Sequence, residues 1–351
     1  MEVYLILADG KSVHTLKWVK ELHKYFKIII ISFNSFLSEI IEIVGKENCI
    51  DLRCDIHSAG GNWRVLWNSL RVKDIIVSKQ PKYINAHYIT SYGTVAVIAS
   101  ILGGYEGKII LSTWGTDILV TPWKNKMYYF LTRYILRKSF LITSDSVYMT
   151  KKICDIYRKA NVMTFPFGIE FYPIVSYQEK DKALFFSNRG LELNYNVDRI
   201  IEIFSCLYKK GKARKLYIAN DGSERKKLES LVEHLDISEA VVFVGFLSAD
   251  EQAEYYRKCQ FYFSTPSSDS TSVSLLEAMS YGCIPIVSRI PANCEWIEDG
   301  VNGIFIEDML EKDGFDNLQC ESAFYANRNK ILDKALWNKN IYGYINKLIS
   351  T

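Results

Sequence analysis

The chain lacks the cysteine patterns that hold metals or disulfide frameworks. Its eight cysteines include no Cys-x-x-Cys pair, and none lies at zinc-binding spacing from any of the five histidines. A small zinc module and a disulfide-stabilised scaffold are therefore excluded. The cysteines are expected to be reduced and structural, as in a cytosolic protein.

Long apolar runs are also missing. One of the longest, residues 27–33, falls well short of the roughly 20 residues that cross a bilayer. The first apolar run, residues 1–8, has no basic start and no small-residue cleavage site, so it indicates a first strand and not a signal peptide. Low-complexity segments and short repeats are absent, and 48% of the residues are apolar, which is typical of a globular chain. These features predict a cytoplasmic protein.

Size and charge limit the organisation and the partners. With 351 residues the chain is long for one core, and two domains are expected. The net charge of +3 conceals an asymmetry: residues 1–165 hold 22 Lys plus Arg against 13 Asp plus Glu (+9), and residues 166–351 hold 21 against 27 (−6). A basic first half suits nucleic acid, an anionic membrane surface or a phosphorylated acceptor. No recognisable nucleic-acid module occurs, so nucleic acid is not expected.

Short apolar strands alternate with segments of helical periodicity along the whole chain. The elements expected in the first half span residues 3–7, 13–25, 28–32, 83–86, 94–102, 109–112 and 141–143. Those expected in the second half span residues 183–187, 197–209, 215–219, 224–235, 241–244, 249–258, 261–264, 274–281 and 284–287. This alternation predicts an α/β fold of two doubly wound, parallel-sheet domains of the Rossmann-like kind.

The join between the domains is expected between Pro166 and Lys182, where a polar stretch follows Phe-Pro-Phe-Gly-Ile-Glu. The predicted domains are residues 1–170 and 171–335, and the aromatic-rich amphipathic segment 336–351 is expected to pack back on the first. Ligands of open parallel sheets bind beyond the carboxyl ends of the strands. The site is therefore expected in a cleft across which the domains face each other.

The segment from Ser264 to Ser288 is the most informative part of the sequence. It places Asp269 and Glu277 around a run of small hydroxyl residues that is expected to open a helix. A helix N-terminus offers free amides and the positive end of the helix dipole, which together bind phosphate. The alternative is a loop acid and a helix acid on a solvated face.

This segment, with the glycine turn and proline that follow it, resembles the signature of family 4 glycosyltransferases, in which two acids flank seven residues. Matches in the same order along the chain are Asp9-Gly10, Asn85-Ala86-His87-Tyr88, Ser112 to Asp117, Pro166-Phe167-Gly168-Ile169, Ser187-Asn188-Arg189, Asn220-Asp221-Gly222 and Val244-Gly245-Phe246. The resemblance implies a GT-B fold and a retaining transferase, of the kind found in bacterial surface polysaccharide biosynthesis (O-antigen or capsule).

The resemblance also implies roles for individual residues. The donor is a nucleotide diphosphate sugar, with UDP-hexose or UDP-N-acetylhexosamine favoured, and Arg189 meets the charge of the leaving diphosphate. Glu277 holds the ribose hydroxyls, and Asp269, where the family has Glu, orients the transferred sugar. The residues implied to bind the nucleotide sugar are Gly10, Tyr195, Gly245, Phe246, Ser272, Val273, Ser274 and Glu277.

One departure from the family pattern concerns the diphosphate. Tyr195 stands where the family has a second phosphate-binding Lys, and a tyrosine hydroxyl brings a hydrogen bond without a charge. The cation could come instead from helix residues, which equally suit a solvated surface: Arg199, Arg225, Lys226 and Lys227. No Asp-x-Asp occurs in the chain, so a metal-bridged diphosphate clamp has no candidate and no metal cofactor is expected.

The first half offers candidates for sugar or acceptor contacts. His87 precedes a loop dense in hydroxyl groups, where an imidazole can hydrogen-bond a sugar hydroxyl, contributing to catalysis, or serve the structure alone. His14 carries a weaker version of the same argument. Trp114 and Asp117 suit an aromatic platform and a hydroxyl acceptor for the acceptor sugar, or a buried Trp and a helix N-cap.

Two segments, Trp63–Lys73 and Trp123–Lys138, combine cations with aromatic residues. The second holds five cations and no acid. Basic amphipathic helices with interfacial aromatics lie on anionic membranes, so peripheral contact with the inner face of the cell membrane is one interpretation. Core aromatics with solvated cations are the other.

The leading hypothesis is a retaining hexosyl- or N-acetylhexosaminyltransferase that acts on a lipid-linked or oligosaccharide acceptor. Two alternatives stay open: a sugar-nucleotide epimerase on the same fold, and a non-catalytic partner of another transferase. An epimerase needs acid and base groups around the sugar ring, and the sequence shows no convincing set. Conversion of donor without acceptor distinguishes the epimerase, and nucleotide binding without turnover distinguishes the partner.

Overall fold

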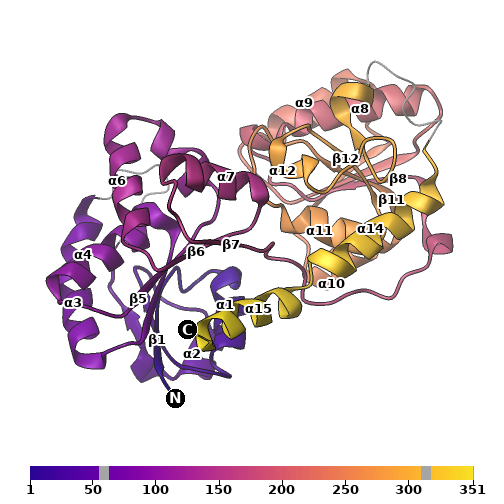
Figure 1. The fold of residues 1–351 in the computed structure, drawn as a ribbon. Helices are drawn as coiled ribbons and strands as arrows, with labels where there is room; N and C mark the ends of the chain where they lie inside the picture. The colour runs from indigo at the N-terminus through magenta and orange to yellow at the C-terminus, as the bar shows by residue number, and fades with distance from the viewer. Residues whose placement is uncertain (55–62, 310–317, 351) are drawn as a thin grey trace. The chain divides into compact units, whose positions relative to one another are not determined.

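The computed structural model describes residues 1–54, 63–309 and 318–350, and the chain divides into two compact units (Figure 1). Unit 1 comprises Met1–Phe165 and Ile341–Thr351, and unit 2 comprises Pro166–Asn340. The boundary predicted from the sequence lies after residue 170. No helix among the described residues is long and apolar enough to cross a membrane.

Unit 1 is built on a parallel sheet of seven strands in the order β3-β2-β1-β4-β5-β6-β7. The strands are β1 (Val3–Leu7), β2 (Lys27–Ser32), β3 (Cys49–Asp51), β4 (Tyr83–His87), β5 (Lys108–Ser112), β6 (Leu141–Ser144) and β7 (Val162–Thr164). Central strands such as β1 and β4 are buried along most or all of their length, because helices cover both faces of the sheet.

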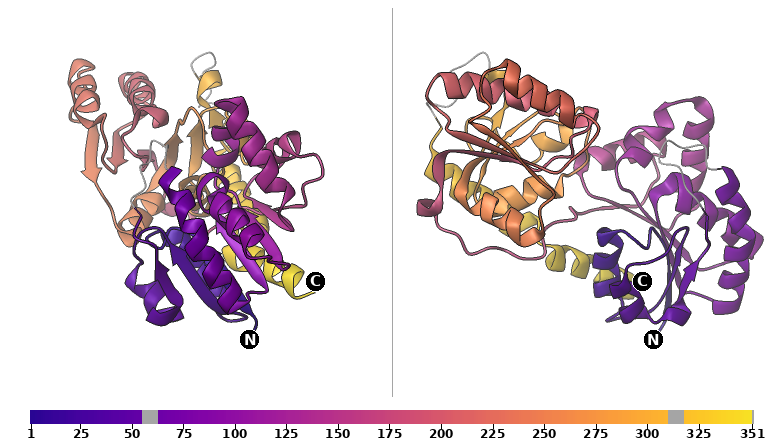
Figure 2. Two further views of the ribbon diagram at one scale, coloured as in Figure 1. Left: turned by 90° about the vertical axis from the view of Figure 1, so that its left-hand side faces the viewer. Right: turned by 180° about the vertical axis from the view of Figure 1, so that it is seen from behind.

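The helices of unit 1 are α1 (Val13–Leu22), α2 (Ser38–Val44), α3 (Asn68–Lys79), α4 (Thr94–Leu102), α5 (Thr116–Leu119), α6 (Lys126–Arg137) and α7 (Val147–Ile156). Shorter turns span Lys46–Asn48, Trp63–Trp67, Tyr88–Gly93 and Thr121–Trp123. Side chains of Ser12, Asn125 and Ser146 cap α1, α6 and α7. Right-handed crossovers place α1 and α2 on one face of the sheet, and α3, α4, α6 and α7 on the other (Figure 2).

Unit 2 is built on a second parallel sheet, of six strands in the order β10-β9-β8-β11-β12-β13. The strands are β8 (Asp181–Ser187), β9 (Lys215–Ala219), β10 (Val241–Gly245), β11 (Cys259–Ser264), β12 (Ile284–Val287) and β13 (Ile304–Phe305). The direction of winding reverses between β8 and β11, which makes this pair the topological switch point of the sheet.

The helices of unit 2 are α8 (Val197–Lys209), α9 (Arg225–His234), α10 (Ala249–Lys258), α11 (Val273–Ser280), α12 (Pro291–Cys294), α13 (Ile306–Met309) and α14 (Cys320–Lys334), with short turns at Tyr177–Glu179 and Leu193–Tyr195. Strand β8 contributes to a hydrophobic core on each face of the sheet. Phe185 packs with residues of α8, and Phe186 packs with residues of α10 and α11. The two doubly wound, Rossmann-like sheets predicted from the sequence are thus confirmed.

Helix α15 (Trp337–Ile349) begins in unit 2 and continues into unit 1. At its start, the Trp337 amide donates to the Ile169 carbonyl at 2.9 Å. Further along, the hydroxyl groups of Tyr344 and Tyr4 share a buried hydrogen bond of 2.5 Å, and the hydroxyl of Tyr83 donates to the Leu348 carbonyl at 2.7 Å. Segment 341–350 therefore contributes buried aromatic packing and hydrogen bonds to unit 1.

Gly168 is required where the chain enters unit 2, because its φ is +66° and an added Cβ would lie 2.5 Å from the Ala335 carbonyl oxygen. We expect Gly168→Ala to cost about 2 kcal/mol or more, since both the backbone strain and the clash with backbone must be relieved. Gly211→Ala is the matched control: φ is +69° there, but nothing lies within 4 Å of the added atom. Urea denaturation followed by circular dichroism measures both, and equal losses would show that the clash contributes nothing.

Candidate functional site

The carboxyl ends of β8 and β11 bring two loops together at the switch point of unit 2. These strands are adjacent and parallel, with Phe186 in register with Tyr262. The loop after β8 carries Arg189, and the loop after β11 carries Asp269 and leads into α11. Residues 80 positions apart in the sequence therefore meet at the edge of the sheet where open α/β proteins bind ligands.

Arg189 is the centre of this meeting point. Its guanidinium donates to the Asp269 carboxylate at 2.7 Å and to the hydroxyl of Ser272, and it lies 4.4 Å from the ring centroid of Tyr195. Arg189 is only 8% exposed. Burial opposes its positive charge, but Asp269 together with Tyr262 and Tyr195 outweighs that effect, and the pKa of Arg189 is raised above its usual value. The site thus holds a permanent, preorganised cation.

The N-terminus of α11 lies beside this cation. Ser272 is the N-cap, and its hydroxyl accepts from the Leu275 amide at 3.4 Å. The first turn of any helix leaves amides without an intrahelical partner, and here they belong to Val273 and Ser274. A fixed guanidinium and the positive end of a helix dipole together suit an anion with several oxygens, such as a phosphate or diphosphate.

The carboxylate of Glu277, on α11, is held by a buried network of polar side chains. The hydroxyl of Tyr256 donates to Glu277 Oε2 at 3.3 Å, and it accepts from Asn188 Nδ2 at 2.7 Å. The hydroxyl of Tyr262 donates to Asn188 Oδ1 at 2.8 Å. Burial raises the pKa of Tyr256 well above its usual value, so this hydroxyl stays protonated as a donor. Sequence reasoning missed both tyrosines, although the position of Tyr262 within a buried strand is a signal of a polar partner.

Three of the four cations that could replace a second phosphate-binding residue form ion pairs on the surface. Arg199 pairs with Glu307 at 3.5 Å, and Arg225 pairs with Glu229 at 2.9 Å and with Asp221 at 3.7 Å. Lys227 likewise pairs with Glu224, at 3.0 Å, and Lys226 is exposed. The geometry favours the solvated-surface interpretation for these helix residues. Tyr195 contributes its ring face to Arg189, whereas the sequence had suggested a role for its hydroxyl.

The loop after β10 is open to solvent. Gly245 ends the strand with a φ of +74°, and its carbonyl accepts from the Asn220 amide at 2.7 Å. Phe246 follows with 78% of its surface exposed. A large exposed ring is suited to stacking on a flat ligand, and no ring contact of Phe246 is found within the described residues.

In unit 1, three of the candidate residues, His14, His87 and Trp114, gather in an aromatic cluster at the carboxyl end of β4. The Trp114 ring lies 5.4 Å from that of His87 and 5.2 Å from that of His14, measured between centroids. Trp18 closes the cluster from α1, 5.4 Å from His87, and Tyr88 stacks on Trp114. Within the described part of the chain, neither ring nitrogen of His87 has a hydrogen-bond partner, although the residue is 1% exposed.

Both histidines of this cluster are neutral at neutral pH. Burial lowers the pKa of His87 to about 3, with a smaller effect from His14. Burial also lowers the pKa of His14 to about 4, with a smaller effect from Lys17. A neutral imidazole carries one donor and one acceptor, which is the complement of a sugar hydroxyl.

Two further candidates of unit 1 have structural partners. Asp117 is 1% exposed and accepts from the amides of Trp114 and Gly115, both at 3.1 Å, and of Ile89 at 3.0 Å. It therefore joins two loops, which favours a structural role over an acceptor for a sugar hydroxyl, although the N-cap of α5 is Gly115 and not Asp117. The amide of Gly10 donates to Ser32 Oγ at 3.0 Å, and a Cβ at this position would lie 2.4 Å from the Ser35 carbonyl oxygen. Gly10 is thus needed for the close approach of two loops.

Two models of known protein families match the chain, and together they cover most of both units. The family model described as "Glycosyl transferase 4-like" matches residues 4–146, and that described as "Glycosyl transferases group 1" matches residues 150–316. The first match lies within unit 1, and the second covers the end of unit 1 and most of unit 2. The chain belongs to the GT-B glycosyltransferases.

Individual relatives of this glycosyltransferase are distant. An uncharacterised glycosyltransferase of Methanocaldococcus jannaschii is 24% identical over 97% of the chain and 94% of its own length. Alpha-monoglucosyldiacylglycerol synthase of Streptococcus pneumoniae is 26% identical over 32% of the chain, a match that spans only 25% of the synthase. Lipopolysaccharide 1,6-galactosyltransferase of Salmonella typhimurium is 29% identical over 37% of each chain.

Solved structures share the fold of the whole glycosyltransferase. Anabaena HepE in complex with UDP superimposes with a TM-score of 0.79 at 13% identity, covering 100% of both chains. The lipopolysaccharide outer core galactosyltransferase WaaB, in its apo form, superimposes with a TM-score of 0.75 at 15% identity over 99% of both chains.

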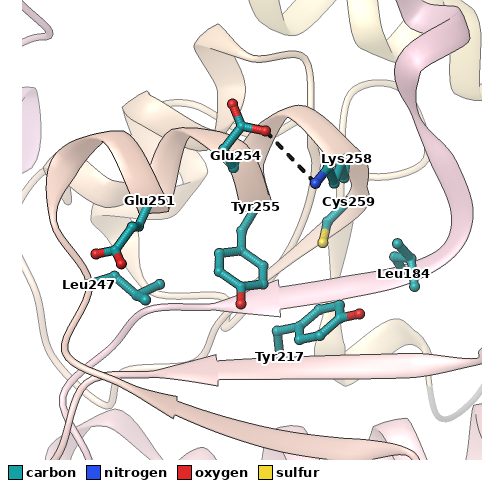
Figure 3. Close-up of a pocket in the computed structure, with 8 residues that line it drawn as sticks. All are labelled: Leu184, Tyr217, Leu247, Glu251, Glu254, Tyr255, Lys258 and Cys259. Carbon is teal, nitrogen blue, oxygen red and sulfur yellow. Dashed lines mark ion pairs between the residues drawn. The ribbon is translucent and has the colours of Figure 1, made fainter.

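A pocket of the glycosyltransferase lies between α10 and strands β8 and β9 (Figure 3). Its lining residues are Leu184, Tyr217, Leu247, Glu251, Glu254, Tyr255, Lys258 and Cys259. Glu254 pairs with Lys258 at 3.8 Å, and Glu251 accepts from the Ser248 amide at 2.8 Å in a capping box. These charged groups stabilise helix α10, and none of the candidate site residues lines the pocket.

The neutral histidines predict an acid-sensitive unit 1. Their folded pKa values, about 3 for His87 and about 4 for His14, lie below the value of about 6.5 expected on unfolding. Falling pH therefore protonates the unfolded chain first, and stability decreases from about pH 6.5 downward by about 1.4 kcal/mol per pH unit for each such proton. We expect His87→Leu to flatten this decrease between pH 6.5 and 4 in thermal melts. The exposed His234 is the control: His234→Gln should leave the slope unchanged, and equal slopes in all three proteins would contradict the assignment.

Proposed function

We propose that the protein is a retaining glycosyltransferase that moves a hexose or N-acetylhexosamine from a uridine diphosphate sugar. The observation that carries the proposal is the buried Arg189 beside the N-terminus of α11 at the switch point of unit 2. The choice of donor is supported by HepE, which shares the fold and has been solved in complex with UDP and in complex with UDP-glucose.

In this proposal the diphosphate binds at Arg189 and the first-turn amides of Val273 and Ser274. Breaking the bond to the anomeric carbon leaves negative charge on the diphosphate, and fixed donors aimed at that charge lower the barrier. Glu277 accepts from the two ribose hydroxyls, for which a carboxylate has enough acceptor positions. The Tyr256 hydroxyl holds Glu277 Oε2 in place, so Tyr256 is a positioning residue.

Asp269 has a double role in the proposed reaction. Before donor binding it neutralises Arg189 through the 2.7 Å ion pair. A diphosphate brings more negative charge to the same guanidinium and replaces the carboxylate as its main partner. Asp269, which is 24% exposed at its side chain, is then available to accept from the hydroxyls of the transferred sugar.

The acceptor and the setting belong to the same proposal. We propose a lipid-linked or oligosaccharide acceptor in surface polysaccharide synthesis at the cytoplasmic face of the membrane. The names of two relatives, a lipopolysaccharide galactosyltransferase and a glucosyldiacylglycerol synthase, support the class of acceptor. His87, His14 and Trp114 offer neutral hydrogen-bonding groups and aromatic faces that suit sugar hydroxyls and sugar rings. The epimerase and the non-catalytic partner are the alternatives, and assays of donor turnover with and without acceptor distinguish them.

The donor site is tested with Arg189→Ala and Glu277→Ala. We expect each to reduce sugar transfer by about 100-fold or more, since a fixed donor at the leaving group or a ribose anchor is lost. Arg199→Ala removes a cation that is paired on the surface with Glu307, and it should keep the wild-type rate. Radiolabelled UDP-sugars with lipid extracts provide the assay, preceded by a thermal-shift screen of donors. Wild-type rates in both site variants at saturating donor would place the site elsewhere.

The reaction is also proposed to be independent of metal ions, because Arg189 and α11 supply the positive charge and the chain contains no Asp-x-Asp. We expect EDTA to leave transfer and UDP-sugar binding unchanged. The control is dialysis of EDTA-treated enzyme back into Mg²⁺ or Mn²⁺. Loss of activity with EDTA that either ion restores would overturn this point while leaving the donor site intact.

A further inference from the structure

Helix α6 presents large apolar side chains to solvent. Trp123, which lies three residues before it, is 47% exposed, and Met127, Phe130 and Tyr134 on the helix are 51%, 61% and 41% exposed. These residues recur at the spacing of one helix face, while the opposite face is buried through Thr132 and its neighbours. Scattered exposed apolar residues are common on proteins, but four that follow one helix form a patch.

Cations surround this patch without any acid to balance them. Lys126, Arg133 and Arg137 are exposed along the helix, with Lys124 and Lys138 at its two ends. No Asp or Glu occurs between Asp117 and Asp145 in the sequence. Within the described ranges none of the five forms an ion pair, and Arg137 and Lys138 lie over the ring of Tyr134, each at 5.7 Å. The charge on this surface therefore remains available to an external anion.

The other basic segment contributes apolar groups more than charge. Trp67 is 78% exposed and Leu70 is 52% exposed, at the start of α3. Arg71 donates to the Leu52 carbonyl at 3.2 Å, and Lys73 pairs with Asp74 at 3.0 Å. The side chains of Trp63 and Arg64 lie outside the described residues. Helices α3, α4 and α6 cover the same face of the sheet of unit 1 (Figures 1 and 2).

We propose that the exposed face of α6 is a docking surface for an anionic lipid bilayer. Apolar side chains of this size enter the boundary between headgroups and acyl chains, and the surrounding cations attract anionic headgroups. A second copy of the chain is a poor occupant, because a symmetric contact would set five cations against five others. The proposal goes beyond the donor chemistry, and it does not depend on which sugar is transferred.

The test is co-sedimentation of the full chain with vesicles of phosphatidylcholine alone and of phosphatidylcholine mixed with phosphatidylglycerol. We expect binding to the mixed vesicles only, weakening as salt is added. The double variant Arg133→Glu, Arg137→Glu should bind at least about tenfold more weakly, because four units of charge are changed beside the headgroups. Phe130→Ser should remove the part of the binding that persists at high salt.

The matched control is Lys20→Glu, Lys27→Glu, which changes the same charge on α1 and at the start of β2, where both lysines are exposed. Equal loss in this control and in the Arg133, Arg137 variant would show that only net charge matters, and absence of wild-type binding would reject the surface. A wild-type dimer in light scattering that the Arg133, Arg137 variant dissociates would assign the surface to a second copy. Thermal shift with UDP should stay at the wild-type value in the surface variants, so failure here leaves the donor site untouched.

Discussion

The structure of the site depends on one buried cation. A guanidinium that is 8% exposed, as that of Arg189 is, costs several kcal/mol of desolvation unless partners surround it. Its partners come from three segments: Asp269 from the loop after β11, Ser272 from the cap of α11, and Tyr195 from the turn before α8. The charge therefore holds these segments together, and the loop geometry at the switch point follows from satisfying it.

The residue before this arginine anchors the same strand end on its other side. Asn188 donates to Gln252 and Tyr256 of α10 and accepts from Tyr262 of β11. Because Tyr256 also donates to Glu277, the cation and this carboxylate are fixed by consecutive residues of one loop. Networks of this kind act as units, so loss of a central hydroxyl disturbs several groups at once. This coupling gives unit 2 a preorganised distance between the two groups proposed to hold the diphosphate and the ribose.

The sequence predicted the two doubly wound sheets because hydrophobic periodicity depends on local structure. It singled out Arg189, Asp269 and Glu277 because they lie in short motifs that follow one another in the order typical of the family. It did not predict that Arg189 and Asp269 pair, since that contact depends on which strands are neighbours, and β8 and β11 are far apart in the chain. Likewise, the sequence left two interpretations open for Asp117, because only the folded loops bring the Ile89 amide to its carboxylate. Short edge elements such as β3 are too brief to show periodicity.

The aromatic cluster of unit 1 restricts how a proton leaves the acceptor in the proposed reaction. A general base must hold the proton that it takes, and a buried imidazole with a pKa of about 3, as in His87, holds one poorly at neutral pH. The Asp117 carboxylate accepts hydrogen bonds from three backbone amides, so it is also unsuited to the role of general base. His87 is therefore suited to orienting a hydroxyl and unsuited to removing its proton. The proposed reaction therefore uses the leaving diphosphate oxygen to accept that proton, and transfer on the face that the leaving group vacates would retain the anomeric configuration.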